Sequence, residues 1–217
     1  MGSTFPVVAG RRLYVRDNDR LYCYDIRQHP PGSVLPGPKM VQLALPKDTG
    51  SPPRLGGDRV ANAIFVPTPQ DVVEKMLSAA NVGKDDVVYD LGSGDGRIVI
   101  AAAKKYGCRA VGLEIDRDLI RLSWERAREA KVDKLVTMKE VDIFSADFSD
   151  ATVVTVYLYP GLLNRLLPQL EKLKPGTRIV SHQFAIPAMP PEQTITIESN
   201  ETGTKHTVYL WTTPLKK

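Results

Sequence analysis

Three alternate glycines between two apolar segments constrain the fold of this chain more than any other feature. The chain reads Val87-Val-Tyr-Asp-Leu-Gly-Ser-Gly-Asp-Gly-Arg97, and an apolar run follows from Ile98 to Ala103. A strand, a glycine turn and a helix in this order are typical of Rossmann-like α/β sheets, where glycines let the backbone turn sharply and approach a ligand. We therefore expect a ligand site between a strand at 87–91 and a helix at 96–106.

The residues around the glycines indicate which ligand this turn would bind. Arg97 stands where the dinucleotide pattern Gly-x-Gly-x-x-Gly has its third glycine, which disfavours NAD(P). Asp90 would repel a pyrophosphate, yet its carboxylate can receive an ammonium group through a bridging water. Backbone N–H groups at the helix start favour a carboxylate or a phosphate. A ligand with an ammonium, a carboxylate and a ribose meets these conditions, so the sequence predicts S-adenosylmethionine (SAM) as cofactor.

A second carboxylate stands at the place expected for a ribose contact. Arg109-Ala-Val-Gly-Leu-Glu114 is a short apolar run that ends in an acid 18 residues after Gly96. In Rossmann-like sheets a carboxylate about 20 residues beyond the glycine loop accepts hydrogen bonds from the ribose. Asp116 is the alternative, but we expect it to begin the next helix. Glu114 is therefore the predicted ribose ligand.

Beyond residue 60, segments of helical and strand periodicity alternate as in a doubly wound sheet. Thr68-Pro69 predicts the start of the first helix, with Thr68 as its side-chain cap and apolar residues at helical spacing as far as Ala80. We expect an α/β fold: a doubly wound, seven-stranded Rossmann-like sheet with an antiparallel C-terminal hairpin. Its further elements are predicted as strands at 87–91, 109–114, 135–140, 152–159, 177–183, 193–199 and 205–212, and helices at 96–106, 117–130 and 161–173.

The first 60 residues differ in pattern from the rest. Alternating apolar residues at 7–16 and 20–25 flank Asp17-Asn-Asp19, which predicts a short N-terminal β-hairpin appendage that resembles the end of a β-propeller blade. Seven prolines between residues 30 and 53 predict an extended linker. We therefore expect an appendage at 1–29, a linker at 30–60 and a catalytic domain at 61–217. One blade cannot form a propeller, so the hairpin predicts no cofactor of its own.

Composition places the chain among intracellular enzymes. Nine of its 29 basic residues and five of its 25 acidic residues lie in residues 1–60, so residues 61–217 are neutral overall and nucleic acid is not an expected partner. The two cysteines, Cys23 and Cys108, predict a reducing, cytoplasmic compartment. The three histidines share no metal-ligand spacing with them, so no metal is expected. The sequence contains no apolar run of about 18 residues, and no membrane segment is expected.

Residues 65–211 resemble the archaeal broad-specificity protein lysine methyltransferases and the mitochondrial enzymes that modify an ATP synthase ring subunit. The resemblance rests on the glycine turn, on Phe65-Val-Pro-Thr-Pro69 and on Val111-Gly-Leu-Glu114. Phe65 stands where the family often has tyrosine, and residues 1–60 have no counterpart in the short archaeal form. The later matching segments are Ala151-Thr-Val-Val-Thr-Val-Tyr-Leu158, Leu173-Lys-Pro-Gly-Thr-Arg178, Val180-Ser-His-Gln-Phe184 and His206-Thr-Val-Tyr209.

This resemblance implies a class I methyltransferase fold that binds SAM at the glycine turn. It implies that Asp142 contacts the adenine amino group and that Ile143 or Phe144 packs against the ring, with a loop or capping role as the alternative for Asp142. The cofactor contacts derived above and those implied by the resemblance are Phe65, Pro67, Thr68, Asp90, Gly92, Ser93, Gly94, Gly96, Glu114, Ile115, Asp142, Ile143 and Tyr157.

Methyl transfer to an amine requires a neutral nucleophile in line with the methyl group and the sulfur. A free lysine titrates near a pH of about 10.4, and a cationic cofactor in a partly dry channel lowers that pKa. Tyr157 and Tyr159, at the end of the strand expected at 152–159, are the predicted catalytic residues that line this channel, with packing as the alternative role for each. A ring there can also face the sulfonium. His182 is expected to be either a structural histidine or a substrate contact.

The helix expected at 117–130 is assigned no role in catalysis. Trp124 is expected in the core, and Arg121, Arg126 and Arg128 are expected to be solvated charges. For the whole chain, the sequence predicts a SAM-dependent methyltransferase that N-methylates protein lysines by in-line transfer. Two alternatives are kept: a small-molecule SAM-dependent methyltransferase, and a SAM-binding module that acts by binding a partner through its N-terminal hairpin.

Overall fold

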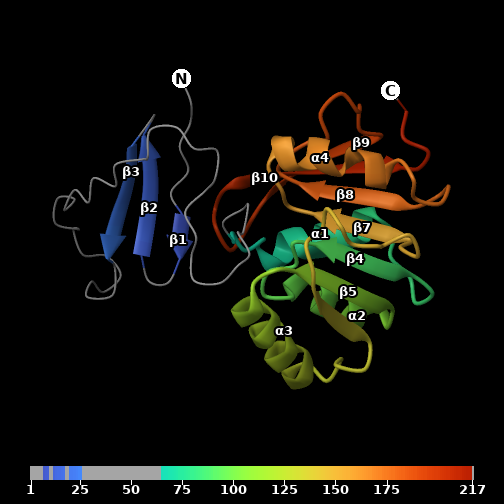
Figure 1. Ribbon diagram of the computed structural model, residues 1–217, viewed down its shortest axis with the longest axis horizontal. Coiled ribbons are helices and arrows are strands. Elements are labelled where there is room, and N and C mark those ends of the chain that lie inside the picture. The colour runs from blue at the N-terminus through green and yellow to red at the C-terminus, as the bar shows by residue number, and fades with distance from the viewer. Residues whose placement is uncertain (1–6, 10–11, 18–19, 26–64, 217) are drawn as a thin grey trace. The chain divides into compact units, whose positions relative to one another are not determined.

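The computed structural model describes residues 7–9, 12–17, 20–25 and 65–216. It divides the chain into two units, residues 1–66 and 67–217, which are treated separately below (Figure 1). The larger unit contains the predicted catalytic domain.

A seven-stranded sheet forms the centre of the larger unit, in the order β6-β5-β4-β7-β8-β10-β9. Neighbours from β6 to β8 are parallel, and β10 pairs antiparallel with both β8 and β9. This arrangement confirms the predicted Rossmann-like fold with an antiparallel C-terminal hairpin. The strands are β4 (Val87–Leu91), β5 (Arg109–Glu114), β6 (Val136–Glu140), β7 (Val153–Val156), β8 (Arg178–His182), β9 (Gln193–Glu198) and β10 (Lys205–Thr212).

Alternation along the strands places two hydrophobic cores on opposite faces of the sheet. Val88 belongs to the core that contains the apolar residues of α1 (Gln70–Ala79), α2 (Arg97–Tyr106) and α3 (Arg117–Glu129). Its neighbour Tyr89 belongs to the other core, which contains those of α4 (Pro160–Leu170). Three helices therefore cover one face and α4 covers the other (Figure 1). The carboxyl ends of the parallel strands then form one edge, where such sheets place their ligands.

Strand β7 is shorter than predicted, and this changes the setting of the two tyrosines. It ends at Val156, whereas the sequence predicted a strand to residue 159. Tyr159 is the N-cap of α4, and Pro160 occupies the first turn, where its missing N–H and fixed φ favour a helix start. Tyr157 and Tyr159 therefore lie in the connection after the strand, and the alternation rule of a regular strand does not apply to them.

The first helix also begins differently from the prediction. Pro69 is the N-cap of α1, and no side-chain hydrogen bond caps this end. The hydroxyl of Thr68 is instead hydrogen-bonded to Nδ1 of His182, 114 residues away. A tertiary contact thus replaces the local cap that the sequence suggested.

The smaller unit contains three antiparallel strands, β1 (Val7–Ala9), β2 (Arg12–Asp17) and β3 (Arg20–Asp25). The β2–β3 pairing, with Asp17 opposite Arg20, agrees with the predicted hairpin. The strand predicted over 7–16 is instead two strands, because Ala9 pairs with Arg12. The linker predicted at 30–60 lies outside the described residues.

Deletion of residues 1–60 is expected to leave a folded, SAM-binding protein. The predicted cofactor residues and all seven strands of the larger sheet lie beyond that cut. A deletion of residues 1–70 is expected to weaken SAM binding as well, because it removes Thr68, which contacts Arg97 and His182. Thermal melting and calorimetry with SAM on both deletions test this. An insoluble 61–217 fragment would place the domain boundary elsewhere.

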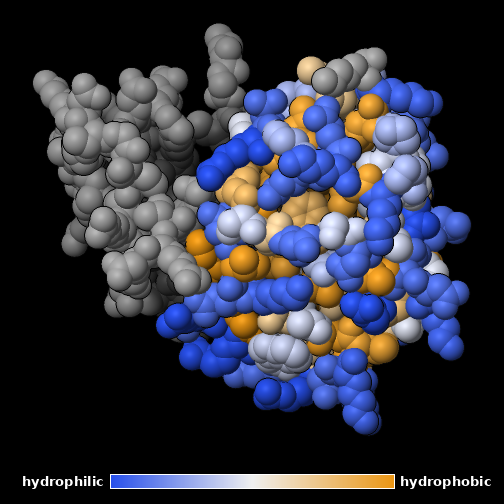
Figure 2. All heavy atoms as spheres, turned by 45° about the vertical axis from the view of Figure 1, so that its right-hand side comes forward, coloured by the Kyte–Doolittle hydropathy of each residue, from blue (hydrophilic) through white to orange (hydrophobic). Residues whose placement is uncertain are grey.

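The surface of the larger unit is mixed in polarity. Figure 2 shows hydrophobic side chains between charged ones on the face in view. Among the described residues, Val66 and Tyr159 are the large hydrophobic residues that are exposed. None of the helices in the described part of the chain is both long and apolar enough to cross a membrane.

Candidate active site

The glycine turn after β4 has a backbone that other residues would adopt with difficulty. Gly92, Gly94 and Gly96 have φ values of 80°, 55° and 76°, in the left-handed region. The N–H groups of Gly92 and Ser93 donate to the carbonyl of Leu113 on β5, at 2.9 and 3.0 Å. These two bonds hold the turn against the end of the neighbouring strand, next to the predicted ribose ligand.

Glu114 is buried at the end of β5 and bonds directly to the glycine turn. One carboxylate oxygen, Oε2, accepts from the N–H of Gly94 at 2.8 Å. The other, Oε1, accepts from the N–H groups of Ile115 and Asp116, at 2.7 and 3.0 Å. A carboxylate offers about four lone-pair sites, so one acceptor position is left for a ligand hydroxyl. The structure thus brings Glu114, Ile115 and the glycine turn together, as the sequence predicted.

Asp116 has the role expected of the alternative candidate. It is the N-cap of α3, and its side chain accepts from the N–H groups of Asp118 and Leu119. This capping occupies its carboxylate, so the structure favours Glu114 over Asp116 as the acid that faces a ligand.

Asp90 is a nearly fully buried carboxyl group at the end of β4, with 3% of its surface exposed. Its Oδ1 accepts from the hydroxyl of Thr155 on β7 at 2.7 Å. Burial raises the pKa of Asp90 to about 7; hydrogen bonds from Thr155 and Ser93 oppose this rise, and the charges of Glu114 and Asp95 add to it. A cationic ligand group close to Asp90 would relieve this unfavourable burial.

Asp95 forms an ion cluster that the sequence analysis missed. Its carboxylate is 2% exposed and binds Arg97 through two hydrogen bonds, Nε–Oδ1 at 2.9 Å and Nη2–Oδ2 at 2.6 Å. Arg126 of α3 also bonds to Oδ2, so the expectation of a solvated Arg126 was wrong. Burial raises the pKa of Asp95, but the hydrogen bonds and charges of Arg97 and Arg126 outweigh it and hold the pKa below the ordinary value. The cluster ties α3 to the glycine turn.

Replacement of Asp95 by asparagine is expected to lower the free energy of unfolding by about 2 kcal/mol, because two arginines lose a buried counter-charge. The folded-state pKa is lowered, so this stabilisation is present above the unfolded pKa of about 3.9 and is lost as pH falls through the folded pKa. Denaturant titrations at pH 7 and at low pH measure the difference. Asp118→Asn is the control, since its pair with Arg121 is exposed. Equal stability of both variants at pH 7 would contradict the account.

The segment before α1 is anchored to the glycine turn. The Thr68 carbonyl accepts from Nη1 of Arg97 at 2.7 Å, and the Thr68 side chain is buried against His182. Pro67, next to Thr68, is exposed. Phe65 falls in the smaller unit, and its predicted cofactor contact stays a prediction.

Aromatic side chains gather beyond the ends of β7 and β8. The Tyr157 ring centroid lies 4.1 Å from that of His182 and 6.3 Å from that of Phe184. The Tyr159 centroid lies 5.5 Å from that of Phe184, and Tyr159 is 48% exposed. Burial raises the pKa of Tyr157, and Tyr159 adds to the rise, so the Tyr157 hydroxyl stays neutral near pH 7. The two predicted catalytic tyrosines therefore share an aromatic cluster, and Phe184 is a member that the sequence analysis missed.

Asp142 and its neighbours lie in the loop after β6. The Oδ1 atom of Asp142 accepts from the N–H of Phe144 at 2.9 Å, which is a local loop contact. Ile143 packs partly against the core below α4. The guanidinium of Arg165 lies 3.7 Å from the centroid of the Phe144 ring and covers it. Of the two candidates for the adenine contact, this arrangement favours Ile143.

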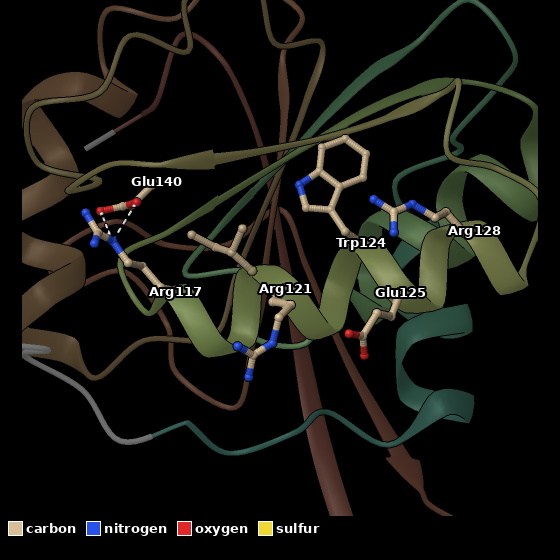
Figure 3. A pocket seen from close by; sticks show the side chains of 7 residues that line it. Arg117, Arg121, Trp124, Glu125, Arg128 and Glu140 are labelled. Atoms are coloured by element: carbon tan, nitrogen blue, oxygen red, sulfur yellow. Dashed lines mark hydrogen bonds and ion pairs between the residues drawn. The ribbon is translucent and has the colours of Figure 1, made fainter.

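A separate hollow runs along α3 on the outside of the unit (Figure 3). Trp124 lies in it half-buried, so the expectation of a core position was only partly right, while Arg121 and Arg128 are exposed as expected. None of the predicted cofactor or catalytic residues lines this hollow. Its lining residues are Arg117, Ile120, Arg121, Trp124, Glu125, Arg128 and Glu140. In the described part of the chain, no group of His, Cys, Asp and Glu side chains is arranged to hold a metal ion.

Comparisons with known proteins agree with this geometry. A family model described as the ANTKMT methyltransferase domain matches residues 90–193. The protein-lysine N-methyltransferase of Saccharolobus islandicus is 44% identical over 70% of this chain and 94% of its own length. An ATP synthase lysine N-methyltransferase of Mus musculus is 35% identical over 60% of this chain and 52% of its own length. A solved structure from Salinibacter ruber, described as an RNA methyltransferase in complex with S-adenosyl-L-homocysteine, is 48% identical with a TM-score of 0.65, over 70% of this chain and 96% of its own.

Proposed function

We propose that this chain, which belongs to the SAM-dependent methyltransferase family of the Saccharolobus islandicus protein-lysine N-methyltransferase, transfers methyl groups from SAM to lysine side chains of proteins. The observation that carries the proposal is the convergence of Glu114 on the glycine turn, with buried Asp90 beside it. Two carboxylates and the N–H groups of a glycine turn match the ribose, ammonium and carboxylate of SAM. The donor set therefore fits the cofactor.

The residues of this chain would divide the work between binding and alignment. SAM, when bound, supplies an electrophilic methyl group on a sulfonium. Glu114 and Asp90 hold the ends of the cofactor, and the aromatic cluster of Tyr157, Tyr159 and Phe184 shields the amine from water. Poor solvation disfavours the ammonium form of lysine, so more of the amine is neutral and nucleophilic.

RNA is the competing acceptor, because the Salinibacter ruber protein is described as an RNA methyltransferase. Two observations favour lysine. The archaeal and mouse relatives are both described as lysine N-methyltransferases. Basic and acidic residues balance in residues 61–217, whereas an RNA-binding domain usually carries a positive surface.

A partition of transferred label tests this choice. The full chain is incubated with a cell lysate and SAM labelled in the methyl group, and the macromolecules are digested with either a protease or a ribonuclease. Protease-sensitive label is the expected result, and ribonuclease-sensitive label would make RNA the acceptor. Glu114→Gln serves as the control for label introduced by lysate enzymes.

The affinity for SAM is expected to rise with pH between 6 and 8. The pKa of Asp90 is about 7 in the free protein, so its ionised fraction rises about tenfold over this range. The ionised carboxylate is the form that attracts an ammonium, and the dissociation constant should fall by up to about tenfold. Calorimetry at several pH values measures this, and Asp90→Asn should flatten the dependence. The same slope in Asp90→Asn would show that another group titrates.

We also propose an intracellular location, from the reducing environment that a chain with two cysteines suggests. Cys108 is buried and free, which agrees with that proposal.

A further inference from the structure

A continuous chain of hydrogen bonds runs from Thr68 to the surface turn between β9 and β10. The Thr68 hydroxyl lies 3.1 Å from Nδ1 of His182, and Nε2 of His182 lies 2.9 Å from Nδ1 of His206. The Nε2 atom of His206 lies 3.2 Å from the hydroxyl of Thr202 and 3.1 Å from that of Thr204. The last three contacts link a fully buried imidazole to exposed hydroxyls.

The sheet itself aligns the two histidines. His182 ends β8 and pairs with Val208 of β10, so His206 is its diagonal neighbour on the same face of β10. The inner end of the chain lies at the proposed active site, because the His182 ring packs on Tyr157 and Thr68 follows Pro67.

Every donor and acceptor of the two rings is satisfied in either direction of the chain. In one arrangement Thr68 donates to His182, His182 donates through Nε2 to His206, and His206 donates through Nε2 to the threonines. In the other arrangement each proton sits on the opposite partner, and all bonds are reversed. The two arrangements differ by one proton shift along each bond, which is the property of a proton-conducting chain.

Both imidazoles are neutral near pH 7, as such transfer requires. Burial, reinforced by His206, lowers the pKa of His182 to about 3. Burial also lowers the pKa of His206, although the charge of Asp71 opposes the shift. Besides each other, the titratable groups that face the pair are Tyr157 on the inner side and Asp71 of α1 on the outer side. A proton therefore passes through the pair and does not stay on it.

We propose that Thr68, His182 and His206 form the path by which the proton lost by the substrate amine reaches solvent, an inference that rests on the proposed lysine methylation. A lysine ammonium must lose one proton for each methyl group that it accepts, and the aromatic cluster limits direct access of water to the amine. The path supplies an exit through the rear wall of that cluster.

One proton leaves the amine and one proton enters solvent. The amine N–H bond breaks as the proton binds Oγ1 of Thr68, and the Thr68 hydroxyl proton moves to Nδ1 of His182. The proton on Nε2 of His182 moves to Nδ1 of His206, and the proton on Nε2 of His206 passes to water at the turn of residues 202–204. No charge is left on the rings. They must reorient before the next proton, so the path carries one proton per turnover.

Two substitutions of His206 separate proton transfer from packing. His206→Ala removes the ring, and His206→Gln keeps an acceptor and a donor but cannot shift a proton between them. Single-turnover methyl transfer at saturating SAM is expected to slow about tenfold or more in both variants. Free imidazole is expected to restore His206→Ala, where the space is open, and to leave His206→Gln slow. Lys205→Ala, an exposed neighbour on β10, is the control with unchanged rate.

The binding of SAM is measured in parallel, because a damaged fold would also slow transfer. Both variants should bind SAM within about twofold of the wild type, and larger losses would reassign His206 to packing. A wild-type rate in His206→Gln would overturn the path and leave the proposed function intact. Failure of the wild type to methylate any lysine would overturn the proposed function and the path with it.

Discussion

Replacement of Glu114 by glutamine is expected to weaken SAM binding by about tenfold to a hundredfold. The carboxylate accepts three backbone N–H groups, so an amide N–H group must face at least one of these donors in the variant. The ribose also loses an ionised acceptor. Hydrogen bonds to a charged group contribute about 1.5–3 kcal/mol, and 1.4 kcal/mol is about tenfold in affinity. Calorimetry with the full chain measures the change.

Glu140→Gln is the matched control for this substitution. Glu140 ends the neighbouring strand β6, is paired in register with Glu114, and binds the exposed side chain of Arg117. It has the same chemistry at the same edge of the sheet but lies away from the glycine turn, so its loss should leave SAM affinity within about twofold. Equal losses in the two variants would show that general charge at this edge attracts SAM, and would remove Glu114 from the site.

Gly96→Ala is expected to destabilise the fold by about 3 kcal/mol or more and to abolish measurable SAM binding near room temperature. A Cβ atom at this position would lie 2.8 Å from both Cβ and Oγ of Ser123, which is itself bonded to the Gly94 carbonyl. Overpacking costs about 1–3 kcal/mol, and the left-handed backbone adds about 1 kcal/mol. Denaturant titration and calorimetry measure the two effects.

Gly107→Ala isolates the backbone contribution. Gly107 has a φ of 69°, close to that of Gly96, but a Cβ there would meet no atom within 4 Å. This variant should lose about 1 kcal/mol and keep its SAM affinity. If both alanine variants were equally stable, the close packing of α3 against the glycine turn would contribute nothing.

The sheet and the glycine turn could be predicted from sequence because their signals are local. Apolar alternation fixes which face of a strand is buried, and a left-handed turn requires glycine. The acid Glu114 could be found for the same reason, since it directly ends an apolar strand. The early end of β7 also had a local signal that the sequence analysis did not use: Pro160 favours a helix start, which leaves Tyr157 and Tyr159 outside the strand.

The features that the sequence did not reveal depend on tertiary packing. Arg126 reaches Asp95 because α3 packs against the glycine turn, and the 31 residues between them carry no pattern that indicates this. Thr68 looked like a helix cap, but its hydroxyl bonds to His182 from a distant strand. The pairing of His182 with His206 likewise requires the antiparallel register of β8 and β10, which no spacing of single histidines predicts.

Mass spectrometry of a proteome treated with the purified full chain and heavy-methyl SAM tests the central claim most directly. Proteolytic fragments would be sequenced to locate each heavy methyl group. The account predicts heavy methyl groups on lysine Nζ atoms, absent when Glu114→Gln replaces the wild type. Heavy methyl groups confined to RNA or to other amino acids, with none on lysine, would contradict it.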